Sequence, residues 1–146
     1  MGYGVWGRAG VESGATMGEQ AYRKLEAWQV AMDLVEAVYR VSRRFPEDER
    51  FGLIAQVRRA AMSIPNNIAE GYGRIHRGDY VHHLSMARGS LMEVETSLIV
   101  AVRLGFASRE DAAPIWDLLQ RTGKLLTQLI RSLGGKIPPT TDSPPA

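Results

Sequence analysis

The chain has 146 residues, a length that corresponds to one domain. Its hydrophobic fraction of 45% and charged fraction of 23% are typical of a soluble globular protein. Cysteine is absent, which excludes a disulfide scaffold, a cysteine-ligated metal and a cysteine nucleophile. No apolar run reaches the roughly 18 residues that span a bilayer, and the N-terminus has no signal-peptide core. We therefore expect a cytoplasmic protein without membrane contact.

The net charge of +2 is small but unevenly distributed. Residues 1–49 carry six basic and eight acidic side chains, whereas residues 50–107 carry seven basic and four acidic ones. The excess of positive charge therefore begins in the middle of the chain, where it favours a polyanionic partner.

Two segments lack the periodicity of a folded element. Residues 1–20 contain six scattered glycines and predict a flexible leader. Residues 134–146 begin with two glycines and contain four prolines, and they predict a disordered tail. The folded domain is expected to comprise residues 21–133.

The first predicted helix runs from about residue 22 to residue 45, where Pro46 ends it. It carries two apolar rows that lie nearly opposite each other. A helix in a monomeric bundle needs only one apolar face, so two rows indicate burial on both sides. We take the second row as a candidate oligomer interface. The first row is Leu25, Trp28, Met32, Val35 and Tyr39, and the second is Val30, Leu34, Ala37 and Val41.

The second helix is predicted from about residue 46 to Tyr72, with a kink at Pro65 and glycines 71 and 73 at its end. Its apolar residues keep a regular helical spacing, as expected for a face that packs in the core of a bundle. The other face carries Ser63, Asn67 and Glu70, and serine and asparagine are poor helix formers. We therefore predict that this polar stripe forms a buried or interfacial network and not a solvated face.

The third helix is expected to begin with Asp79 as N-cap and to end at Gly105. Gly89 and Ser90 lie in its middle, where glycine costs about 1 kcal/mol relative to alanine. This cost predicts close approach of another backbone. The fourth helix is expected to run from an N-cap at Ser108 to Gly134. With no β-type alternation, the chain predicts an all-α, up-down-up-down four-helix bundle.

A set of small and polar residues on the second and third helices is therefore predicted to form a structural or interface motif. Its members are Ser63, Asn67, Glu70, Gly71, Gly89, Ser90 and Glu93.

Catalytic and metal-binding motifs are absent. The chain has no phosphate-binding Gly-x-x-x-x-Gly-Lys loop, no Gly-x-Ser-x-Gly elbow and no inward Glu-x-x-His pair. His76, Asp79, His82 and His83 are better explained as solvated residues near a helix end than as metal ligands. We expect a non-catalytic protein without cofactor, metal or small-molecule substrate.

Basic residues instead gather on the second helix, the following loop and the start of the third helix. They predict phosphate contacts, and Tyr72 and Tyr80 among them could stack on bases if exposed. The alternative is that these arginines form surface ion pairs with nearby carboxylates, and the pattern does not choose between the two. The candidate nucleic-acid-binding residues are Arg58, Arg59, Arg74, Arg77, His82, His83 and Arg88.

The run from Gln56 to Arg74 resembles the signature of four-helix bundle proteins encoded in intervening sequences of bacterial 23S rRNA genes, also labelled S23 ribosomal proteins. Residues 25–28 and 87–96 add supporting matches, and the resemblance covers about residues 22–133. It implies a ring-like homopentamer and kinship with the accessory variability proteins of diversity-generating retroelements, which bind a reverse transcriptase and its RNA.

The expected function is therefore that of a non-catalytic, self-associating scaffold that binds RNA through the basic cluster. The alternative is an accessory protein-interaction module, for example the partner of a reverse transcriptase, with no direct nucleic-acid contact.

Overall fold

The computed structural model describes residues 21–137 of the chain. It contains a short 3-10 helix η1 (Ala21–Lys24), helix α3 (Glu26–Ser42), a second 3-10 helix η2 (Glu47–Glu49), and helices α4 (Leu53–Tyr72), α5 (Arg77–Arg103) and α6 (Arg109–Ser132). These residues include four α-helices and no strand, which confirms the predicted fold class. The predicted leader and residues 138–146 of the predicted tail lie outside the described part. Ile137, which is described, packs against the core.

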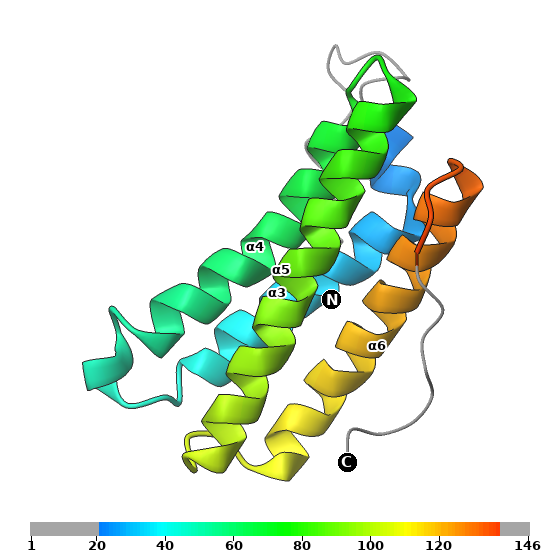
Figure 1. Ribbon diagram of the computed structural model, residues 1–146. Coiled ribbons are helices and arrows are strands. Elements are labelled where there is room, and N and C mark those ends of the chain that lie inside the picture. Colours follow the sequence, from blue (N-terminus) through cyan, green and yellow to red (C-terminus); the bar gives the residue numbers. More distant parts are fainter. Residues whose placement is uncertain (1–20, 138–146) are drawn as a thin grey trace.

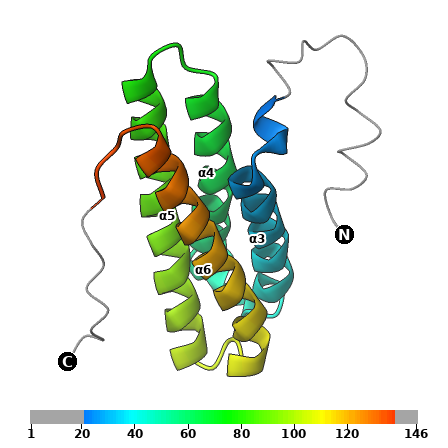
Figure 2. The same cartoon turned by 90° about the vertical axis from the view of Figure 1, so that its right-hand side faces the viewer.

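Successive α-helices run in opposite directions, as Figure 1 shows. Each helix packs against the next one, and α6 closes the bundle against α3. One end of the bundle therefore gathers η1, the end of α4, the start of α5 and the end of α6, which Figure 2 shows together. None of the helices between residues 21 and 137 has the length and apolarity needed to cross a membrane.

Helix α3 buries one wide face, because it lies between α4 and α6. Ala27, Ala31 and Val38 form the centre of this face and are at most 5% exposed. The two rows predicted from the sequence are the two margins of that face. Val30 and Val41 on the second row are also buried within the single chain, at 2% and 8% exposure. This corrects the prediction of an oligomer interface there, because the fold of one chain already buries three of the four residues in the row.

Helices α4 and α5 form the most extensive contact in the bundle. Gly71 explains their close approach near the connection between them. A Cβ atom at Gly71 would lie 2.8 Å from the Cβ of His83 and 2.9 Å from Cδ2 of Tyr80. The absence of a side chain on α4 is therefore what allows the first turns of α5 to pack there.

The helix ends follow local signals in most cases. Pro65 is buried inside α4, which continues through it as expected. Ser108 caps α6 by accepting a hydrogen bond of 3.0 Å from the backbone N–H of Asp111. The Ser108 hydroxyl and the nearby Arg44 guanidinium lower the pKa of Asp111 below its ordinary value. Gly105, with φ of +76°, follows the end of α5.

Two predicted helix starts were wrong. The acidic residues 47–49 form η2, and α4 begins only after Gly52. Helix α5 begins at Arg77 with His76 in the N-cap position, where its side chain makes no capping hydrogen bond. Asp79, the predicted cap, lies in the first turn, where its carboxylate still complements the positive end of the helix dipole.

Candidate functional site

The structure does not bring the seven predicted nucleic-acid contacts into one cluster. Arg58 is half-buried and points toward α3. Its Nε donates a hydrogen bond of 2.8 Å to Ser42 Oγ, and its Nη2 donates one of 3.3 Å to the Tyr39 carbonyl oxygen. The guanidinium also lies over the Tyr39 ring, 4.6 Å from the centroid. Arg58 therefore ties α4 to the negative C-terminal end of α3 and is not free for a phosphate.

Arg59 and Arg88 lie away from the α4–α5 connection. Arg59 is exposed on α4, thirteen residues before the last residue of that helix, which corresponds to roughly 20 Å along its axis. Arg88 lies two helical turns after Val81 on the same side of α5. Val81 approaches the segment after α6, where a Cβ at Gly135 would lie 3.1 Å from Val81 Cγ1. Arg88 thus lies on the α6 flank of the bundle.

Arg74 and Arg77 are exposed at the α4–α5 connection, and His82 is exposed further along α5. The topology adds basic residues that are distant in sequence, from η1 and from the end of α6. We call this part of the molecule the basic end. Over residues 21–26, 70–79 and 130–137 it carries six basic side chains against three acidic ones: Arg23, Lys24, Arg74, Arg77, Arg131 and Lys136 against Glu26, Glu70 and Asp79.

The opposite end of the bundle is close to neutral. Residues 40–52 and 102–111 carry six basic and five acidic side chains. Arg44 is paired with Asp111 at 3.0 Å. The two ends therefore differ in net charge by two units, although they hold the same number of basic residues. The sequence missed this asymmetry because four of the residues that create it, Arg23, Lys24, Arg131 and Lys136, lie far from the predicted cluster along the chain.

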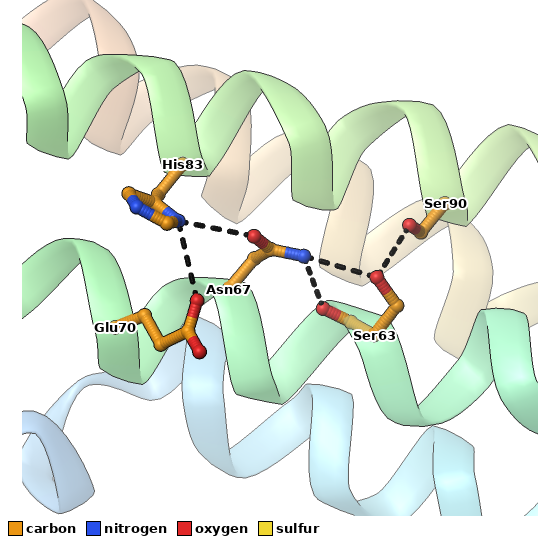
Figure 3. A network of polar contacts seen from close by, with 5 residues as sticks. All are labelled: Ser63, Asn67, Glu70, His83 and Ser90. Atoms are coloured by element: carbon orange, nitrogen blue, oxygen red, sulfur yellow. Dashed lines mark hydrogen bonds and ion pairs between the residues drawn. The ribbon is translucent and has the colours of Figure 1, made fainter.

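The predicted polar stripe forms a hydrogen-bond network between α4 and α5, shown in Figure 3. Ser90 Oγ donates to Ser63 Oγ at 2.8 Å. Asn67, which is 7% exposed, donates from Nδ2 to the Ser63 carbonyl oxygen at 2.8 Å and to Ser63 Oγ at 3.0 Å. His83 Nδ1 lies 3.1 Å from Asn67 Oδ1 and 3.5 Å from Glu70 Oε2. The network links the two helices over about two turns.

The geometry of the network determines which ring nitrogen of His83 carries a hydrogen. The Ser63 carbonyl can only accept, so the amide nitrogen of Asn67 must face it and Oδ1 must face His83. Because Oδ1 and the Glu70 carboxylate are both acceptors, Nδ1 of His83 carries the hydrogen. Asn67 separates His83 from the two serines, so the imidazole is not positioned as a base for either hydroxyl. This arrangement is that of a structural network between helices.

Tyr80 is held in the packing beside this network. Its ring lies edge-to-face with Tyr72, with centroids 6.0 Å apart, and its hydroxyl oxygen is buried without a hydrogen-bond partner in residues 21–137. Burial, reinforced by the nearby Tyr72, raises the pKa of Tyr80 above its ordinary value. Tyr80 is therefore a packing residue, whereas Tyr72 is 36% exposed and keeps aromatic surface for a ligand.

The outer face of α5 exposes apolar side chains that the bundle does not cover. Met86, Met92, Ile99 and Val100 are each 38–50% exposed. Gly89 lies among them, and a Cβ there would meet nothing within 4 Å. The close backbone approach predicted at Gly89 is thus absent among residues 21–137. Gly89 instead lines a shallow depression of about 230 Å³ between α4 and α5, together with Gln56, Met92, Glu93, Thr96 and Ser97.

The described residues contain no group of three or more histidine, aspartate or glutamate side chains that could hold a metal ion. Glu93, predicted to belong to the interface motif, has no hydrogen-bond or ion-pair partner between residues 21 and 137 and is exposed.

Comparisons with known proteins agree with this fold. The family model of the 23S rRNA-intervening sequence proteins matches residues 23–128. The chain is also similar to the crystal structure of a protein with unknown function from the S23 ribosomal protein family, from Bacteroides thetaiotaomicron VPI-5482. The two share 23% identity with a TM-score of 0.67, over 72% of this chain and 98% of that one, which establishes the fold alone. No curated protein matches the chain.

Proposed function

The chain belongs to the 23S rRNA-intervening sequence protein family, and from this premise we propose that it is a non-catalytic RNA-binding protein that contacts RNA through the basic end of its bundle. The observation that carries the proposal is the difference in charge between the two ends. One end holds twice as many basic as acidic side chains, and the other is nearly balanced.

The proposed contacts are with phosphates. Arg74 and Arg77 are exposed on both sides of the α4–α5 connection, and neither has an ion-pair partner between residues 21 and 137. An arginine fork matches two phosphate oxygens, and its binding to RNA releases condensed counterions. Affinity should therefore fall as salt rises. Contacts of this kind carry little sequence information.

The test replaces both arginines by glutamate, Arg74→Glu with Arg77→Glu. Binding of a structured RNA is measured by fluorescence anisotropy between about 50 and 200 mM salt. We expect the dissociation constant to rise at least tenfold and the slope of log affinity against log salt to become shallower by about 1.4, since each phosphate contact to a single strand contributes about 0.7.

The matched control makes the same charge change at the opposite end, with Arg103→Glu and Arg109→Glu. Both residues are exposed, so the variant has the same net charge as the test variant. We expect it to bind RNA within about twofold of the parent, because the site is local. Equal losses in the two variants would mean that net charge alone attracts the RNA, and the basic end would then not be the site.

A second candidate function is that of an interaction module that self-associates through the outer face of α5. The homopentamer implied by the family resemblance needs a surface, and the second row of α3 does not offer one. The exposed apolar side chains around Gly89 do, because a glycine in mid-helix costs about 1 kcal/mol and its open surface admits another helix backbone. An accessory role beside a nucleic-acid-processing protein would fit this candidate without direct RNA contact.

Gly89→Leu tests this candidate without disturbing the single chain, because the new side chain points into open space. Its control is Gln120→Leu, at an exposed position of α6. If the face is an interface, the parent and the control form an oligomer and Gly89→Leu shifts to the 16.1 kDa monomer. Light scattering after size exclusion measures the mass. A parent that is already monomeric, or a Gly89→Leu variant of full oligomer mass, contradicts the candidate.

A further inference from the structure

The connection between α4 and α5 presents an isolated apolar side chain at the basic end. Ile75 is 95% exposed, the highest value among the large hydrophobic residues of the described chain. It stands between Arg74 and His76, with Arg77 one residue further on, and no carboxylate lies in residues 73–78. The connection lies at the top of the bundle in Figure 1.

The backbone on both sides of Ile75 is held in place. The N–H of Gly73 donates to the Ala69 carbonyl at 3.2 Å, and the N–H of Arg74 donates to the Gly71 carbonyl at 3.1 Å. On the other side the N–H of Tyr80 donates to the His76 carbonyl at 3.2 Å. The close packing at Gly71 then fixes α4 and α5 relative to each other. Ile75 therefore projects from a connection whose two ends are anchored.

An exposed apolar residue on its own carries little meaning, and Phe51 provides the comparison. Phe51 is 89% exposed at the opposite end, but the guanidinium of Arg50 lies over its ring at 5.5 Å, and the acidic segment Glu47–Glu49 precedes it. Ile75 has the opposite surroundings, with cations on both sides along the chain. A β-branched side chain is also stiff at χ1, so little side-chain entropy is lost when it packs against a ligand.

Building on the RNA-binding function proposed above, we infer that the connection recognises RNA where paired nucleotides meet unpaired ones. Ile75 is the apolar wedge against an exposed base face, and Arg74 and Arg77 bind the phosphates on either side. The three residues lie within four positions of the chain, so they contact one short stretch of nucleotides.

The chemistry selects this class of RNA over a continuous duplex. In a duplex the base faces are stacked on one another, and the deep, narrow major groove excludes side chains. Base faces are accessible in hairpin loops, bulges and strand ends, and aliphatic side chains are known to act as wedges at unstacked steps. The exposed surface of Tyr72, at the end of α4, lies beside the connection and offers a second apolar surface for such a base.

The test uses two RNA duplexes of the same sequence and without hairpin loops, one with a single extra unpaired nucleotide in one strand and one without it. A 2-aminopurine at the bulge reports base unstacking. The variants are Ile75→Ser and, as matched control, Phe51→Ser. Both residues are almost fully exposed, so neither change should alter the fold. Circular dichroism confirms this for each variant.

Ile75→Ser should weaken binding to the bulged duplex about tenfold, leave the salt slope unchanged and abolish the 2-aminopurine response, while binding to the continuous duplex stays the same. Phe51→Ser should bind like the parent. A parent that binds with the expected salt dependence, but whose preference for the bulge survives Ile75→Ser, overturns this inference and leaves the proposed function standing. A parent that binds neither RNA overturns both.

Discussion

Replacing Gly71 by alanine should lower the free energy of unfolding by about 2–3 kcal/mol, although alanine is the better helix former. The new methyl group would lie 2.8 Å from the Cβ of His83 and 3.2 Å from the carbonyl oxygen of Tyr80. The position of the His83 Cβ is set by the backbone of α5, and the Tyr80 carbonyl oxygen is part of that backbone. Neither atom can therefore move unless α5 moves. Helix α5 would then have to shift away from α4, which would strain the hydrogen bonds to Asn67 and Ser63.

Gly89→Ala is the matched control, because it makes the same substitution on the neighbouring helix with nothing within 4 Å. It should raise the free energy of unfolding by about 1 kcal/mol through helix propensity. Urea denaturation at low protein concentration measures both variants. A stabilised Gly71→Ala variant would mean that α4 and α5 are less closely packed at Gly71 than these distances indicate. A destabilised Gly89→Ala variant would indicate that a partner covers that position.

These two glycines show what sequence patterns could and could not predict. The helices themselves follow from 3.6-residue periodicity and from local signals such as the Ser108 cap and Gly105, because these depend on nearby residues only. Which glycine is closely packed depends on how two helices cross. The sequence predicted close approach at Gly89, and the structure places it at Gly71.

The candidate site was partly predictable for the same reason. A network of Ser63, Asn67 and Glu70 was predicted because serine and asparagine are costly at helical positions, so their presence indicates a structural or functional role. The basic end was predicted only through Arg74 and Arg77, which are close in sequence.

The topology supplied the rest of the site. It brought Arg23 and Lys24 to the same end as Arg131 and Lys136. It also gave Arg58 a partner, Ser42, that lies on another helix and sixteen residues earlier. Periodicity on one helix cannot show either relation, because both depend on the packing between helices.

The two rows on α3 illustrate a further limit. They were correctly identified as apolar, and they lie about 170° apart around the helix axis. The sequence does not show that α4 and α6 both pack on α3, so that a single wide face includes both rows. The small residues Ala27 and Ala31 between the rows, each at most 5% exposed, mark the centre of that face.

Leu34→Glu should therefore abolish cooperative folding. Leu34 is 0% exposed within the single chain and belongs to the main core cluster. The substitution removes a buried leucine, which costs about 3 kcal/mol in itself, and places a carboxylate where no partner is available, which costs several more. The sum is comparable to the whole stability of a domain of this size, about 5–15 kcal/mol.

Ala37→Glu, on the same row, separates a core role from an interface role. Ala37 is only half-buried, at the margin of the buried face, so a glutamate there can reach solvent and the chain should stay folded. Far-ultraviolet circular dichroism with a thermal scan should show a cooperative transition for Ala37→Glu and none for Leu34→Glu. If the row served only to join subunits, both variants would be helical monomers with cooperative transitions. A folded Leu34→Glu monomer would thus show that this row belongs to an interface and not to the core.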